Sequence, residues 1–109
     1  ARGLAAQQHL KNGRDLRSEE KYLEAASEFR LAAALDPTLD VAQLEFRQVE
    51  KLIEARKLAT EAQENLHARR LNKAGKLADE ALAIDPGNAL ALEVFDKLQQ
   101  KEEVLLGGF

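Results

Sequence analysis

Residues 34–39 of the chain read ALDPTL and residues 83–88 read AIDPGN, so Asp36 and its proline recur 49 positions later as Asp85 and its proline. Proline has no backbone N–H to donate, and it disfavours helical angles in the residue before it. Each phrase follows a run rich in alanine and leucine, which are strong helix formers. The repeated phrase therefore predicts two helices that end near the aspartates, each followed at once by another helix. Thr38 or Asp40 is suited to cap the first new helix, and Asn88 the second.

The composition is typical of a soluble helical domain. Of the 109 residues, 45% are hydrophobic, 32% are charged and 5% are aromatic, and alanine and leucine number 19 each. The net charge of −3, without a cluster of lysine and arginine, argues against nucleic acid as a partner. No apolar run approaches the roughly 20 residues that span a bilayer, so we expect no membrane insertion of this segment.

The compartment stays open, because a chain without cysteine suits the cytoplasm and the periplasm equally well. The sequence contains no methionine, even at position 1, which favours a domain cut from a longer protein.

Apolar residues at spacings of three and four predict five helices, over about 4–17, 22–36, 39–68, 71–84 and 88–105. A turn is expected within HARRLN, residues 67–72, where the apolar register changes. In the first helix we expect four residues to point inward: Leu4, Leu10, Gly13 and Leu16. In the long helix we expect an inward stripe of Val41, Leu44, Val49, Leu52, Ala55, Ala59, Ala62 and Leu66. The predicted fold class is all-α.

The first hairpin resembles a tetratricopeptide repeat, over about residues 6–39. The stretch HLKNGRDLRSEEKYLEAASEFRLAAALDP carries the family's signature residues at matching intervals, which are Gly13, Ala25, Phe29, Ala32 and Pro37. Small residues at the first two of these positions let antiparallel helices approach closely, and Phe29 is suited to fill the space beside them.

Residues 55–88 resemble a second, more divergent copy, with small residues and proline in the signature places: Ala62, Ala74, Ala78, Ala81 and Pro86. Here Asn65 stands where a bulky side chain is expected, and Ala78 stands where the first copy has Phe29. The period of 49 exceeds the family's 34 residues. About four helical turns inserted over 40–54 account for the difference, and the last helix, 88–105, is expected to close the second hairpin. The resemblance implies one domain, 1–109, forming a fragment of a right-handed superhelical α–α solenoid.

The resemblance also implies a function, which is binding of a protein or peptide on the concave face formed by the first helix of each hairpin. That face corresponds here to Gln7, Leu10, Arg14, Arg17, Ser18, Arg56, Gln63, Leu66 and His67. The two arginines are suited to meet an acidic segment or a chain terminus. The family's clamp for a C-terminal carboxylate uses asparagines, and Arg14 and Gln63 occupy those places, so the chaperone-tail function is not expected.

Alternative functions come from different classes. A structural module would self-associate as a homo-oligomer through the long helix or the last helix. An enzyme would need a desolvated group in a pocket, whereas the two histidines stand apart from any metal-spaced ligand set and the acidic residues Glu19–Glu28 alternate with basic ones. We therefore expect no catalysis and no cofactor. The alanine-rich hairpins also resemble the helical segment before the pore domain of some bacterial secretion and pilus proteins, which implies a periplasmic assembly role.

Overall fold

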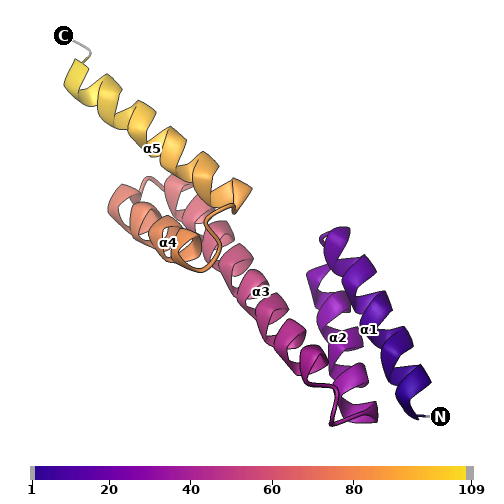
Figure 1. Cartoon of the computed structure of the whole chain (residues 1–109). Helices are drawn as coiled ribbons and strands as arrows, with labels where there is room; N and C mark the ends of the chain where they lie inside the picture. The colour runs from indigo at the N-terminus through magenta and orange to yellow at the C-terminus, as the bar shows by residue number, and fades with distance from the viewer. Residues whose placement is uncertain (1, 108–109) are drawn as a thin grey trace. The chain divides into compact units, whose positions relative to one another are not determined.

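The computed structural model describes residues 2–107, and the side chains of residues 3–100. Over this range the chain forms five helices and no strand: α1 (Arg2–Ser18), α2 (Tyr22–Leu35), α3 (Asp40–His67), α4 (Leu71–Ile84) and α5 (Ala89–Gly107) (Figure 1). The all-α prediction is confirmed. The long helix is continuous for 28 residues, and the turn predicted within residues 67–72 lies between α3 and α4.

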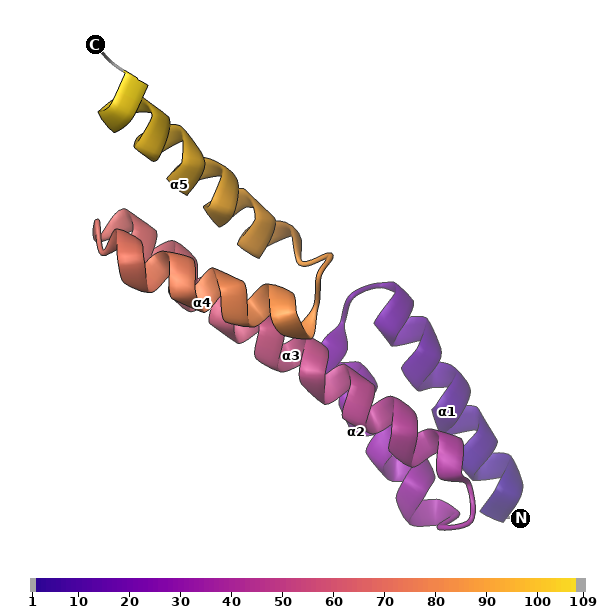
Figure 2. The same ribbon diagram turned by 60° about the vertical axis from the view of Figure 1, so that its left-hand side comes forward.

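The chain divides into two compact units, one ending at Ile53 and the next beginning at Glu54. Unit 1 contains α1, α2 and the first part of α3, and unit 2 contains the rest of α3, α4 and α5. In each unit two helices joined by a tight turn run antiparallel and side by side, α1 with α2 and the second part of α3 with α4 (Figures 1 and 2).

The backbones of the two units repeat at the same interval of 49 that separates the Asp-Pro phrases. Helices α2 and α4 are both 14 residues long, and they begin at Tyr22 and Leu71. Within residues 2–107, the residues of positive φ are Glu20 (62°) and Arg69 (63°). Because these local conformations recur in register, the inserted turns of α3 belong to the repeating unit, and the chain contains one three-helix pattern twice.

The turns that end α1 and α3 have the same hydrogen bonds. Lys21 N donates to Leu16 O, and Glu20 N donates to Arg17 O. Arg70 N and Arg69 N make the equivalent bonds in unit 2, so each helix ends in a Schellman motif around one left-handed residue. The motif satisfies the last carbonyls of the helix and reverses the chain within three residues.

The Asp-Pro corners form as the sequence predicts. Asp36 and Asp85 leave the helix with extended angles, φ −137° and −133°, as a residue before proline should. Their Oδ1 atoms accept bonds from the backbone N–H of Thr38 and Gly87, which closes an Asx-turn at each corner. Asn88 then caps α5, because its Oδ1 accepts from Ala91 N at 2.9 Å.

The core of unit 1 is built around the aromatic ring of Phe29. Phe29 and Ala25 are fully buried, and Leu10, Ala32, Ala42 and Val49 complete the core. A Cβ placed on Gly13 would lie 2.6 Å from the Phe29 ring, so only glycine fits at that point of α1. This confirms the expected close approach of the first hairpin's helices.

The core of unit 2 is made mainly of alanine. It consists of Ala59, Ala62, Leu66, Ala74, Ala78, Ala81, Ala91 and Val94. Asn65, which stands where a bulky side chain is expected, is 8% exposed. Both polar atoms of its amide are hydrogen-bonded: Nδ2 donates to Glu61 O, and Oδ1 accepts from the Arg70 guanidinium. A buried amide with both partners costs little, which is why the hairpin tolerates it.

Three residues predicted to face inward are exposed instead. Leu4 is 76% exposed, and Ala6 is the buried residue of the first turns of α1. In the first part of α3, Val41 and Leu44 are exposed. The buried positions there are Ala42, which the stripe does not include, and Val49, whose predicted burial is confirmed.

Candidate functional site

In unit 1, the residues predicted for the concave face lie along α1. Gln7 and Ser18 are exposed, and the Ser18 hydroxyl donates to Asp15 O at 2.7 Å. Leu10 is only 3% exposed, so it contributes to the core of unit 1 rather than to the surface.

The two predicted arginines come together on a carboxylate of α3. Arg14 Nε lies 3.0 Å from Glu45 Oε1, and Arg17 Nη1 lies 3.2 Å from the same oxygen. Arg17 also lies over the Phe29 ring, 5.7 Å from its centroid. The hydrogen bond from Arg14 to Glu45 raises the pKa of Arg14, against a smaller lowering by desolvation. Glu45 therefore already holds both cations, and an acidic partner would compete with it.

In unit 2, the predicted residues lie on the second part of α3. Arg56 and His67 are exposed, Gln63 is half-buried, and Leu66 is 3% exposed and packed in the core. The nine predicted residues thus fall into two sets, one in each unit.

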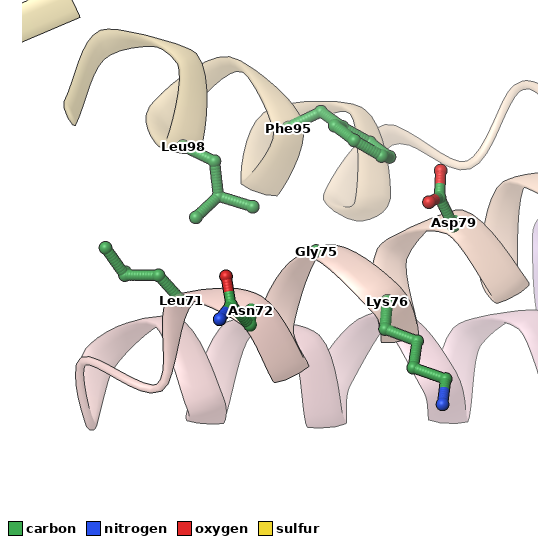
Figure 3. Close-up of a pocket in the computed structure, with 7 residues that line it drawn as sticks. All are labelled: Leu71, Asn72, Gly75, Lys76, Asp79, Phe95 and Leu98. Atoms are coloured by element: carbon green, nitrogen blue, oxygen red, sulfur yellow. The ribbon is translucent and has the colours of Figure 1, made fainter. Parts of the chain in front are cut away.

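A cavity in unit 2 lies between α4 and α5. It has a volume of about 580 Å³ and is lined by Leu71, Asn72, Gly75, Lys76, Asp79, Phe95 and Leu98. We call it the α4–α5 groove. In Figure 3 the side chains of Leu71 and Leu98 approach each other at one end of the groove. At the other end the Asp79 carboxylate points toward the helix that carries Phe95, whereas Lys76 points away.

Unit 1 has the same groove in a smaller form, between α2 and the first part of α3. It has a volume of about 180 Å³, and its lining includes Ala26, Arg30 and Phe46, the counterparts of Gly75, Asp79 and Phe95. The Arg30 guanidinium lies 5.4 Å from the centroid of Phe46, so unit 1 covers its own ring with a cation. Unit 2 has an aspartate at that position, and no cation lies over Phe95 among residues 3–100.

The described side chains contain no group of three or more histidine and acidic residues that could hold a metal ion. Within the same residues, no helix combines the length and apolar composition needed to cross a bilayer.

Comparison of the chain with protein-family models, with curated proteins and with solved structures gave no match.

The residues of the α4–α5 groove were missed at the level of sequence, although a signal for them was present. Phe46 and Phe95 are 49 positions apart, as are Arg30 and Asp79. Aligning the two units over the full period of 49 residues places a cation beside one ring and an anion beside the other.

Proposed function

We propose that this chain is a non-enzymatic protein-interaction module, built from tetratricopeptide-like hairpins, that docks a partner segment in the α4–α5 groove. The observation that carries the proposal is the groove itself, an open cavity with an apolar lining from Leu71, Phe95 and Leu98. Partly exposed apolar walls between two helices suit the insertion of an amphipathic helix.

The glycine in the groove supports this function. Gly75 lies inside α4 with no positive φ, where a glycine destabilises a helix by about 1 kcal/mol relative to alanine. A Cβ at Gly75 would meet only Leu98 Cδ1, at 3.5 Å, which is an ordinary contact. Packing within unit 2 therefore does not require glycine, whereas a partner that approaches the α4 backbone gains from its absence of a side chain.

The polar surface on α1 is a second place for a partner to bind. Arg14 and Arg17 face Glu45, so an acidic segment binds there only by displacing that carboxylate. Arg17→Glu should weaken such binding, and Glu45→Gln, which frees both arginines, should strengthen it. A role in assembling a bacterial secretion or pilus machine is a narrower form of the same proposal and rests on the sequence resemblance alone.

Self-association through α3 is the alternative. The stripe that resembles a coiled-coil seam includes Ala55, Ala59, Ala62 and Leu66, all buried within the fold. Dimerisation through that seam would remove these residues from their cores, which leaves the exposed Val41 and Leu44 as the apolar contacts α3 offers to a second copy.

The proposal is tested with a displayed library of amphipathic helical peptides selected on the intact chain. Binders should lose about tenfold or more in affinity to Gly75→Leu, which fills the groove with a good helix former, and should bind the matched unit 1 variant Ala26→Leu as well as the original chain. Circular dichroism checks that both variants are folded. The proposal would be contradicted by selected peptides whose affinity is unchanged in Gly75→Leu, or by a library that yields no binder.

A further inference from the structure

The difference between the two grooves indicates what the partner must carry. In unit 1 the ring of Phe46 has the Arg30 guanidinium 5.4 Å from its centroid. In unit 2 the ring of Phe95 has Asp79 at the corresponding place, and Asp79 forms no ion pair with any residue whose side chain is described. One unit supplies both ring and cation, and the other supplies the ring and a counter-ion for a cation that comes from elsewhere.

We infer that the α4–α5 groove binds an arginine side chain of a partner helix, over the face of Phe95 and paired with Asp79. This inference rests on the proposed function and names the chemistry of its partner. An aromatic face attracts a cation, most often arginine, and a neighbouring carboxylate adds a charged hydrogen bond. The positive group of the groove itself, Lys76, points away from Phe95 and Asp79 (Figure 3). The place beside that ring and carboxylate is therefore suited to a cation from the partner.

The spacing within α4 defines a second contact. Gly75 lies four residues before Asp79, which is one helical turn, or about 6 Å along the axis. A partner helix laid along the groove with arginine opposite Asp79 places a side chain four residues away above Gly75, next to Leu71 and Leu98. A leucine there fills the apolar end of the groove. The partner is therefore an amphipathic helix that carries arginine and leucine one turn apart.

The test uses pairs of alanine-rich helical peptides that carry one leucine a turn away on each side of a central residue. The centre is arginine in one peptide and citrulline, its neutral isostere, in the other. We expect the arginine peptide to bind the intact chain about tenfold more tightly. The preference should fall below about threefold for Asp79→Asn. For Asp79→Arg, which copies the unit 1 arrangement, binding of both peptides should be lost, because the new arginine covers Phe95 itself.

The outcomes separate the two proposals. Equal binding of the two peptides, abolished by Gly75→Leu, would overturn the arginine site and leave the docking function standing. An arginine preference that persists in Asp79→Asn would also overturn it. Failure of both peptides to bind would contradict the arginine site, while library binders sensitive to Gly75→Leu would still support docking. A dimer in sedimentation that Asp79→Arg converts to monomer would identify a second copy as the occupant and overturn the partner-helix proposal.

Discussion

The two units of this chain have one backbone pattern and two kinds of contact. Where unit 1 pairs Gly13 with the ring of Phe29, unit 2 has Ala62 and Ala78. Where unit 1 pairs Arg17 with Glu45, unit 2 buries Leu66 and Val94.

A third exchange follows the same rule. His9 and Glu28 form a hydrogen-bonded pair across α1 and α2, and their counterparts in unit 2 are Leu58 and Leu77, which pack against the core. Each exchange replaces both partners together. The shared turns and proline corners therefore determine the path of the backbone. The contacts between its helices are made by pairs of side chains that are either polar or apolar.

The largest change in stability is expected from substitutions at Gly13 and Phe29. Phe29→Ala should lower the free energy of unfolding by about 3–5 kcal/mol, because it leaves a cavity in the core of unit 1. Gly13→Ala should lower it by about 1–3 kcal/mol, since the new Cβ meets the ring at 2.6 Å.

The double variant has the side chains of unit 2 at both positions. Its loss of unfolding free energy should be smaller than the sum of the two single losses by at least about 1 kcal/mol, because the ring that clashes is gone. Urea unfolding followed by circular dichroism measures the cycle, and hydrogen exchange of α2 assigns the loss to unit 1. Additive losses would show that the two positions are not coupled.

The second test replaces the ion pairs of unit 1 by the apolar contact of unit 2. Glu45→Ala should cost about 1–2 kcal/mol, since two arginines lose their shared carboxylate, whose side chain is 14% exposed. The loss should shrink in 1 M salt, where exposed charges are screened within about 3 Å. Arg17→Leu combined with Glu45→Val should recover most of it. No recovery would mean that the apolar pair needs other features of unit 2.

The third test removes the Asn88 cap of α5, a bond that the side chain at the matching place in unit 1, Leu39, cannot make. Asn88→Ala should lower stability by about 1 kcal/mol, because the Ala91 N–H at the start of α5 loses its cap. Leu39 occupies the matching place in unit 1, so Leu39→Asn serves as the reciprocal variant. Thermal unfolding measures both. An unchanged melting temperature for Asn88→Ala would show that the cap does not hold α5.

The smallest expected effect comes from exchanging the residues at the two groove positions. Gly75→Ala should raise stability by about 0.5–1 kcal/mol, because the helix gains a better former and the Cβ fits. Ala26→Gly in unit 1 should lower it by a similar amount. If Gly75→Ala instead destabilises the chain, glycine is required by packing, and its role in keeping the groove open loses its support.

Much of the fold is encoded locally, and those parts could be predicted from sequence. The prolines, the asparagine cap and the change of register at residues 67–72 each act within a few residues, so the sequence predicts all five helices, with ends within two residues of those observed. The prediction that Leu4, Val41 and Leu44 face inward is wrong, because burial depends on which face of a helix the neighbouring helices cover. A long helix with apolar residues on more than one side does not specify that face by itself.

The candidate site was harder to predict for a related reason. The sequence shows Arg14 and Arg17 as two positive residues on one face, but not that Glu45, some thirty residues on, holds them both. Likewise, the groove depends on Asp79 and Phe95, from two different helices. Such contacts are set by packing between elements, and only the 49-residue period hinted at them.

The arginine site is tested most directly by following side-chain NMR signals of both units during titration with the arginine-centred peptide. We expect the signals of Phe95 and Leu98 to shift with the peptide. Phe46, which lies under Arg30, and Val49, the counterpart of Leu98, should keep their positions. Equal shifts in both units, or shifts confined to Phe46, would contradict the claim that unit 2 leaves open the place that unit 1 fills with its own arginine.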